Sequence, residues 1–284
     1  MPPLSTSSFA PGATAAVGAA ALSAPWWGRF AMEEGQGGVW ELGPLTLAVE
    51  RRAREWRVSW ATDPQGDEPA TRLAVRCPLP ASELPSGTRT ARFAVHATTP
   101  ELALEPVLPD RPVVARPEPP LNLLAGEEVA LYVALPVWVR ILVAGERALV
   151  EVPAQRLADT WFGPSTLAGE LCYATRTSAG LQPANLPAAP HLATCRVLLT
   201  NRAASPLPLE RLALPVHHLD LWWHRERGLW TRGLEVERAA DGSLASLRLA
   251  DGPPDSVHGA EQVTPARQPE PRLALVRALE ALLG

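Results

Sequence analysis

The sequence contains no lysine, so arginine supplies all of its basic side chains. The formal net charge is −4, and acidic and basic residues are interspersed along the chain. A nucleic-acid-binding domain normally carries a basic patch, and a disordered charged tail needs a run of like charges. Neither pattern occurs, so we expect no nucleic-acid partner. Arginine is also well suited to paired contacts with carboxylates.

Cysteine is scarce, and the three that are present, Cys77, Cys172 and Cys195, lack the CxxC spacing of a zinc site. An odd number of cysteines cannot all pair within one chain. We therefore expect a reducing, cytoplasmic environment, and a Cys172–Cys195 disulfide stays open as an alternative.

The sequence also lacks the signatures of the common catalytic and cofactor sites. It contains no GxGxxG, P-loop, GxSxG, HExxH or EF-hand pattern. No run of eighteen apolar residues follows the N-terminal region, so we expect no transmembrane segment. We expect no cofactor, and catalysis is less favoured than binding. Residues 1–25 are rich in small residues and lack a basic start, which favours a disordered leader. A signal peptide, which would export the protein, and a misplaced start codon are the alternatives.

Thirty-one prolines punctuate the chain and oppose long helices. Short alternating runs between them predict a mainly β fold, with two antiparallel β-sandwich-like halves and a short C-terminal helix. The helix is expected from Leu273, Val276, Leu279, Leu282 and Leu283, which fit one helical face. The expected divisions are a leader at 1–25, an N-terminal β domain at 26–105, a proline-rich crossover at 106–120, a C-terminal β domain at 121–250, and a loop and helix at 251–284.

The most distinctive stretch is WFGPSTLAGELCYATRT, residues 161–177. Gly163 and Pro164 favour a turn, and a strand from Glu170 would place Glu170, Cys172 and Arg176 on one face. Two interpretations compete for Glu170 and Cys172. They are either catalytic candidates, with the thiol as nucleophile or ligand, or Cys172 is a small buried side chain and Glu170 anchors a loop. The packing interpretation is favoured.

The motif FGPxxxxGELCYxxRT, the later ALPV before an aromatic strand, and WELGPLTLAVERRAREWRV near the start carry a resemblance. On these residues the chain resembles an uncharacterised archaeal and bacterial family with a domain of unknown function. The resemblance runs from about Trp27 to Glu237. It implies one intact unit and no known activity.

A metal site is a further alternative. On a strand, His218 and Asp220 share a face about 7 Å apart, close enough to reach one ion. Further ligands would have to come from other strands, such as Glu170, His191 or Cys195. A half-exposed polar strand face is the favoured interpretation.

Tryptophan is abundant at ten residues, whereas phenylalanine and tyrosine together number six. Tryptophan packs in cores, but an exposed indole also binds a protein or stacks on a sugar. We expect a non-catalytic binding module for another protein, with a membrane-associated partner and self-association left open. A metal- or thiol-dependent enzyme and a carbohydrate-binding β-sandwich are the alternatives. The expected binding residues are Trp27, Trp161, Tyr173, Arg176, Trp222 and Trp223.

Overall fold

The computed structural model describes residues 25–63, 71–163, 169–174, 179–241 and 245–269, and it is mainly β. The expected fold class is therefore confirmed. The expected C-terminal helix, the leader and Arg176 lie outside these residues. The described residues contain no α-helix, and their only helical turns are four short 3₁₀ turns: η1 (Ala81–Glu83), η2 (Pro183–Asn185), η3 (Val216–His218) and η4 (Asp255–Val257). No helix in the described part of the chain has the length and apolarity to cross a bilayer.

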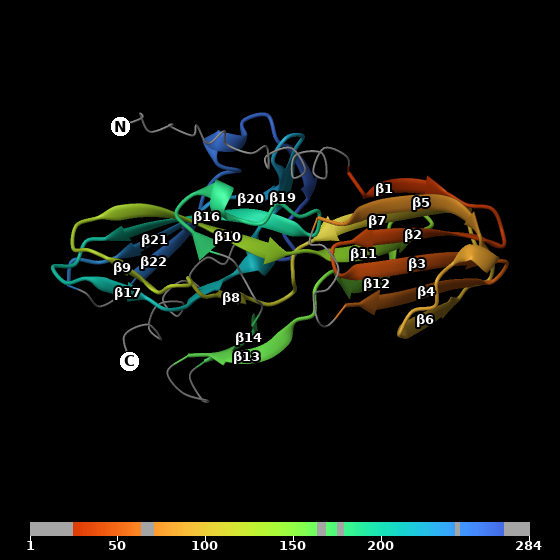
Figure 1. Ribbon diagram of the computed structural model, residues 1–284, viewed down its shortest axis with the longest axis horizontal. Coiled ribbons are helices and arrows are strands. Elements are labelled where there is room, and N and C mark those ends of the chain that lie inside the picture. The colour runs from red at the N-terminus through yellow and green to blue at the C-terminus, as the bar shows by residue number, and fades with distance from the viewer. Residues whose placement is uncertain (1–24, 64–70, 164–168, 175–178, 242–244, 270–284) are drawn as a thin grey trace, which may run out of the picture.

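One lobe is built from two sheets and lies on the right in Figure 1. The first has the order β5-β2-β3-β4-β6 and the second the order β1-β7-β11-β12. The strands of the first sheet are β2 (Gln36–Leu42), β3 (Leu45–Arg52), β4 (Glu55–Thr62), β5 (Leu73–Pro80) and β6 (Arg89–Ala94). The second contains β1 (Gly28–Ala31), β7 (Glu101–Val107), β11 (Trp138–Val143) and β12 (Arg147–Pro153).

The other lobe centres on an eight-stranded sheet, with β15-β10-β16-β20-β19-β23 as its main path and with β21 and β22 beside β16. These strands are β10 (Glu128–Pro136), β15 (Ala179–Gly180), β16 (Leu192–Asn201), β19 (Leu221–His224), β20 (Gly228–Thr231), β21 (Leu234–Arg238), β22 (Ala245–Leu249) and β23 (Glu261–Thr264). A small pair, β9 (Leu121–Leu123) and β17 (Leu207–Leu209), lies at its far end.

The chain crosses between the lobes at Pro136. Strand β10 ends there and pairs with β16, whereas β11 begins two residues later and pairs with β7 and β12. Proline lacks an N–H for the ladder, which explains the break at this position. The hairpin β11–β12 thus lies in the same sheet as β7, although in the sequence β7 begins before the proline-rich crossover and the hairpin follows it. The domain division at 106–120 stays a prediction, and one cluster of buried side chains runs through both lobes.

Two hairpins of the fold form at residues that favour tight turns. Ala144 and Gly145 both have positive φ, 51° and 89°, between β11 and β12, as a tight hairpin requires. Strands β21 and β22 pair antiparallel on either side of Asp241. Three other pairings are parallel, β14 with β8 and β16 with β20 and β21, and local turn signals do not predict them.

A further sheet of four strands carries a projecting hairpin. Its order is β13-β14-β8-β18, with β8 (Val113–Ala115), β13 (Ala158–Phe162), β14 (Glu170–Ala174) and β18 (Leu212–Leu214). In Figure 1 the hairpin β13–β14 projects below the rest of the molecule. The distinctive stretch of the sequence therefore forms the projecting part of the fold.

Candidate binding site

The hairpin β13–β14 has one covered face and one open face. Opposed residues in an antiparallel pair point to the same side, and Trp161 opposes Leu171 while Thr160 opposes Cys172. Cys172 is fully buried, whereas Trp161 and Leu171 are 43% and 42% exposed. We call Asp159, Trp161, Leu171 and Tyr173, which share the open side, the hairpin face.

The covered face is a small apolar cluster of Cys172, Phe162, Val114 and Ala213. The Arg211 guanidinium lies 5.2 Å from the centre of the Phe162 ring, as a cation–π contact. The Cys172 thiol donates to the Glu170 carbonyl at 3.6 Å. Burial, with a smaller effect of the Glu170 charge, raises the pKa of Cys172 to about 12. The thiol is protonated at neutral pH and packs as a small apolar side chain, the favoured interpretation.

Tyr173 fixes the open face to the body of the protein. Its hydroxyl donates to Asp110 Oδ1 at 2.9 Å, and its ring lies 5.9 Å from that of Trp138 on β11. Burial and the hydrogen bond to Asp110 raise the pKa of Tyr173 to about 12, so the phenol stays protonated. These two contacts join the Tyr173 end of the hairpin face to Asp110 and to β11 of the second sheet.

Charged side chains border the tyrosine. The Arg111 guanidinium lies 5.3 Å from the Tyr173 ring centre, and its Nη1 donates to Asp159 Oδ1 at 3.2 Å. Asp159 opposes Tyr173 across the hairpin. The hairpin face thus combines two exposed apolar side chains with a polar margin, an arrangement typical of a recognition surface.

Gly169 gives Trp161 its position. A Cβ at this residue would lie 2.2 Å from Trp161 Nε1 and 2.8 Å from the Phe162 carbonyl oxygen. Real Cβ atoms do not approach this closely, so only glycine allows the indole to lie across the start of β14. The second glycine of the distinctive stretch is needed for this close approach.

The sequence matches the family described as "Protein of unknown function (DUF432)" over residues 26–281. The chain belongs to this family. The match confirms the resemblance and extends it beyond Glu237 almost to the C-terminus. No curated protein and no solved structure matches the chain.

The other expected binding residues of this DUF432 chain lie elsewhere. Trp27 makes edge-on ring contacts with Trp26 at 5.4 Å and with Trp223 at 6.0 Å, and Trp27 and Trp223 pack against the main core. The Trp222 Nε1 is buried without a hydrogen-bond partner. These residues are half-buried, which favours packing over binding. Glu170 is exposed on β14.

The strand geometry expected for His218 and Asp220 is wrong. Residues 216–218 form the 3₁₀ turn η3 after Pro215, and β19 begins only at Leu221. The Asp220 carboxylate is buried and accepts from Arg232 Nε at 2.6 Å and from Gln262 Nε2 at 3.3 Å. His218 instead lies against His217, with ring centres 4.0 Å apart. Asp220 is thus occupied by an ion pair.

His191 and Cys195, the remaining candidates for a metal or thiol site, are buried in or next to β16 and not in the hairpin. All three cysteines are free, so the Cys172–Cys195 alternative is not realised. Burial raises the pKa of Cys195 to about 12 and lowers the pKa of His191 to about 4. Within the described ranges, no three His, Cys, Asp or Glu side chains come together as metal ligands.

Sequence reasoning missed five residues of the site: Asp110, Arg111, Trp138, Asp159 and Leu171. The proline-rich stretch was expected to be a crossover, yet it places Asp110 and Arg111 beside Tyr173. The available signal was the Asp-Arg pair between Pro109 and Pro112, because prolines fix the backbone on both sides of two charged residues.

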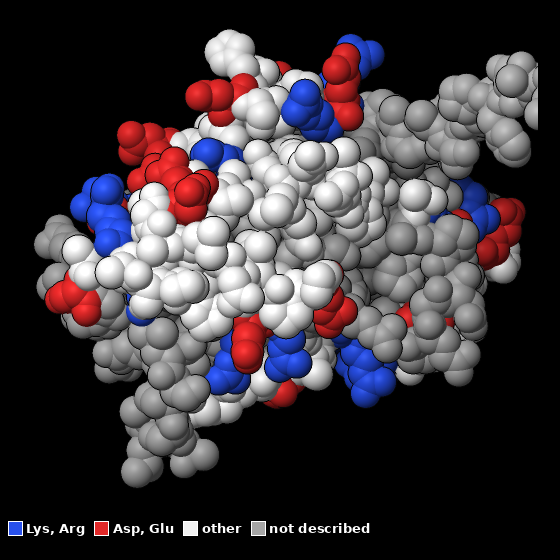
Figure 2. Space-filling view, turned by 60° about the vertical axis from the view of Figure 1, so that its left-hand side comes forward, with Lys and Arg blue, Asp and Glu red and all other residues white. Residues whose placement is uncertain are grey.

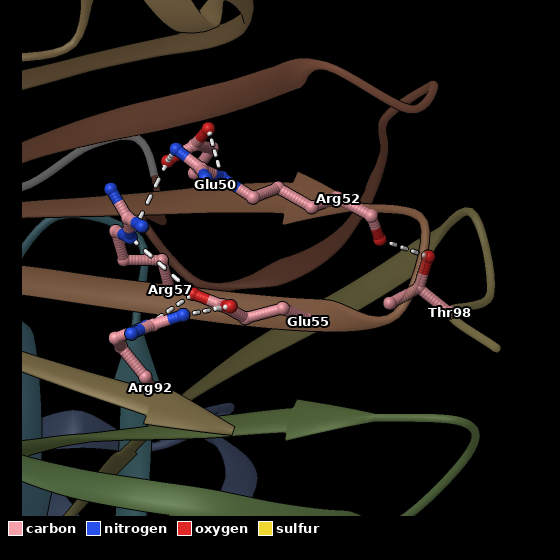
Figure 3. A network of polar contacts seen from close by, with 6 residues as sticks. All are labelled: Glu50, Arg52, Glu55, Arg57, Arg92 and Thr98. Atoms are coloured by element: carbon pink, nitrogen blue, oxygen red, sulfur yellow. Dashed lines mark hydrogen bonds and ion pairs between the residues drawn. The ribbon is translucent and has the colours of Figure 1, made fainter. Parts of the chain in front are cut away.

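A second polar surface lies on the first lobe, over β3, β4 and β6 (Figure 3). Arg52 makes a paired contact with Glu50, at 2.7 and 3.3 Å. Arg92 makes another with Glu55, at 2.7 and 2.6 Å. Hydrogen bonding to Arg92 lowers the pKa of Glu55 to about 2. We call Glu50, Arg52, Glu55, Arg57 and Arg92 the ionic face. Its charges pair with one another, which favours a solvated surface over a basic docking patch.

Charges of both signs are also mixed on the side of the molecule seen in Figure 2. Acidic and basic side chains there alternate around a broad uncharged area. A single-sign field that would attract a polyanion is not visible on this side.

Proposed function

We propose that this DUF432 protein is a non-catalytic binding module that holds a partner protein on the hairpin face. The observation that carries the proposal is the opposed pair Trp161 and Leu171, two large apolar side chains more than 40% exposed on a fixed hairpin. Tryptophan is enriched among residues that dominate binding energy at protein interfaces. A rigid surface also loses less conformational freedom on binding than a loose one.

The chemistry of the other candidates supports binding over catalysis. A thiol is reactive as its thiolate, and burial raises the pKa of both Cys172 and Cys195 to about 12. The pKa of His191, lowered to about 4 by burial, leaves its imidazole neutral. These groups are therefore poorly placed to act as nucleophile or general acid.

The test compares retention of partners by full-length variants. The tagged protein would be purified at low salt from its native host as wild type, Trp161→Ala, Leu171→Asp and Leu124→Ala. Leu124 is 61% exposed outside the hairpin and serves as the matched control. We expect one stoichiometric partner with wild type and Leu124→Ala. Its loss with the two hairpin variants is the expected result, because each removes apolar contact area from the same surface.

The captured partner would then be purified and titrated against each variant. Truncation of a central interface tryptophan typically costs 2 kcal/mol or more, so we expect Trp161→Ala to weaken the Kd by about thirtyfold. Equal affinity of all four proteins would overturn the proposal. Circular dichroism of each variant checks that the fold is retained.

A carbohydrate is the second candidate ligand for the same surface. The exposed Trp161 indole lies on the same face as Asp159, whose carboxylate pairs with Arg111. An aromatic plane beside charged hydrogen-bonding groups suits a sugar ring. A glycan array probed with wild type and Trp161→Ala tests this, and an array without a tryptophan-dependent signal would remove the candidate.

We also propose that the protein works in the cytoplasm. Three unpaired cysteines, two of them fully buried, support a reducing compartment. Fractionation of the native host with an antibody to the protein tests this, and recovery from the exported fraction would contradict it.

A further inference from the structure

Strand β21, near the left end of the molecule in Figure 1, carries an arginine on its buried side. Successive residues of a strand point to opposite faces, so Leu234, Val236 and Arg238 share one side. Leu234 and Val236 belong to the main core and are 1% and 2% exposed, and Arg238 is only 8% exposed. The strand thus has a charged side chain where its alternation predicts an apolar one.

The Arg238 guanidinium contacts main-chain oxygens alone. Its Nη1 donates to the Ser205 and Pro206 carbonyls, at 3.2 Å each. Its Nε is buried without a hydrogen-bond partner. Within the described part of the chain, no carboxylate forms an ion pair with Arg238, and its Nη2 makes no hydrogen bond. One edge of the guanidinium, with the donors Nε and Nη2, is therefore left without an acceptor.

The nearby carboxylates are already paired with other arginines. Asp220 is 5% exposed and accepts from Arg232 Nε at 2.6 Å. Glu237 precedes Arg238 on the opposite side of β21 and pairs with Arg202 at 2.8 Å. Arginine keeps its proton in proteins, so Arg238 cannot avoid the cost of burial by becoming neutral. A buried charge without a partner is unfavourable, and proteins accept such costs mainly at functional sites.

The turn formed by residues 202–206 is held over Arg238 by a second buried polar side chain. Asn201 on β16 pairs with Arg238 across the parallel strands and is fully buried. Its Nδ2 donates to the Ser205 carbonyl at 2.9 Å, and its Oδ1 accepts from the Ala203 N–H at 3.2 Å. Asn201 thus has its hydrogen bonds within the protein, whereas Arg238 does not.

We propose that the Nε and Nη2 edge of Arg238 binds an oxyanion, the phosphate or carboxylate group of a small-molecule ligand. Two parallel N–H···O bonds to such a group fit the fork of a guanidinium. Ala204, Ser205 and Pro206 are exposed, so we expect the ligand to approach past this turn, where the Ser205 hydroxyl is a further donor. None of these residues belongs to the hairpin face, so the proposal does not depend on the partner protein.

Thermal unfolding of the full-length protein tests the site with inorganic phosphate and acetate as probes. Wild type, Arg238→Met and Arg202→Met would be melted in each anion and in chloride at equal ionic strength. A ligand that binds only the folded state raises the Tm, so we expect a saturable rise of about 3 °C or more for wild type. The anion that produces the rise identifies the group that the site prefers.

Arg202→Met is the matched control, because it removes a second arginine of the same turn. Arg202 is 60% exposed and pairs with Glu237, so we expect this variant to show the same saturable rise as wild type. Arg238→Met should show none. A saturable rise that persists in Arg238→Met would overturn the proposal. So would a wild-type rise that does not saturate, which reflects exclusion of ions from the protein surface, or no rise at all.

The Tm without a binding anion separates a ligand site from a structural arginine. Methionine restores the apolar pattern of Leu234 and Val236 and removes the unpaired charge. We therefore expect Arg238→Met in chloride to melt at or above the wild-type Tm. A Tm several degrees lower, together with no anion-dependent rise in wild type, would show that Arg238 only holds the turn.

Arg238→Lys keeps the test decisive if the methionine variant does not fold. Lysine retains the charge but lacks the planar fork that contacts two oxygens at once. We expect the anion concentration that gives half of the Tm rise to increase about tenfold, because one of two charge-assisted hydrogen bonds is lost. An unchanged half-saturating concentration would overturn the assignment of the site to Arg238.

Discussion

The ionic face and the hairpin face are both exposed, but they differ in what their side chains still offer to a partner. On the ionic face, Glu55 is bound by Arg92 and Glu50 by Arg52, so the charges are already paired (Figure 3). On the hairpin face, Trp161 and Leu171 expose large apolar areas to water. Water solvates the first surface well and the second poorly, so removing water favours association at the hairpin.

The difference arises from what supports each surface. The ionic face is the outside of a sheet whose other side packs in the main core through Val58 and Trp56. The hairpin has only the small cluster around Cys172 beneath it, and Tyr173 at its base. The exposed apolar side chains of the hairpin therefore rest on a much smaller support than the charged side chains of the ionic face.

The largest expected effect removes the support of the hairpin. Cys172→Asp would place a carboxylate in a fully buried position among the apolar side chains of Val114, Phe162 and Ala213. An unpaired buried charge costs about 3 kcal/mol or more, which urea denaturation can measure. Cys172→Ala is the control, with a smaller loss of about 1 kcal/mol from the cavity. A Cys172→Asp protein as stable as wild type would show that the cluster does not support the fold.

A smaller effect is expected at the base of the hairpin. Tyr173→Phe removes the hydroxyl that donates to Asp110 and leaves the ring contact with Trp138. We expect a loss of about 0.5–1 kcal/mol in the free energy of unfolding, because this hydrogen bond is partly accessible to water. Hydrogen exchange in β14 should increase at the same time. Unchanged exchange in β14 would mean that another contact holds the hairpin.

A substitution on the ionic face should change the stability less than the two hairpin substitutions, and the change should depend on the salt concentration. Glu55→Gln removes the partner of Arg92 on an exposed surface, where ion pairs contribute little. We expect a small shift in the urea midpoint at low salt that disappears at high salt, because mobile ions screen exposed charges. A large decrease in the free energy of unfolding that does not depend on salt would contradict this expectation and show that the pair is important for the stability of the lobe.

Acid should weaken the ionic face in a defined window. The pKa of Glu55 is lowered in the folded protein from 4.5 to about 2, mainly by the hydrogen bond from Arg92. A lowered carboxyl pKa contributes stability that is complete above pH 4.5 and is lost as the pH falls toward 2. NMR titration of the Glu55 carboxyl carbon would measure this pKa directly. A midpoint near 4.5 would contradict the pairing.

Local signals in the sequence anticipated much of the fold. Apolar residues alternate with polar ones around Val49, Val58 and Val197, where the structure has strands, and Ala144 and Gly145 stand at the turn of a hairpin. Alternation and turn chemistry depend on neighbours in the chain, so they can be recognised without tertiary structure. The same locality explains the error at His218, where the 3₁₀ turn after Pro215 interrupts an otherwise strand-like pattern.

The candidate site was only partly predictable. Trp161 and Tyr173 lie in the distinctive stretch and were expected as binding residues. Their positions in the sequence, however, do not tell whether their side chains are exposed. Trp161 is 43% exposed, while Trp27 and Trp223 are half-buried, contact each other and pack against the main core. The two environments differ because strands from distant parts of the chain pack around Trp27 and Trp223, whereas Trp161 lies on the projecting hairpin.

The sequence by itself determined the β-rich class, the family and the turn positions, because these follow from residue type and local spacing. Tertiary structure alone decided that β11 leaves β10 to pair with β7, and that Asp110 meets Tyr173 across 63 positions of the chain. Pairing between distant strands depends on which faces exclude water together. That choice involves the whole chain at once, and no local pattern contains it.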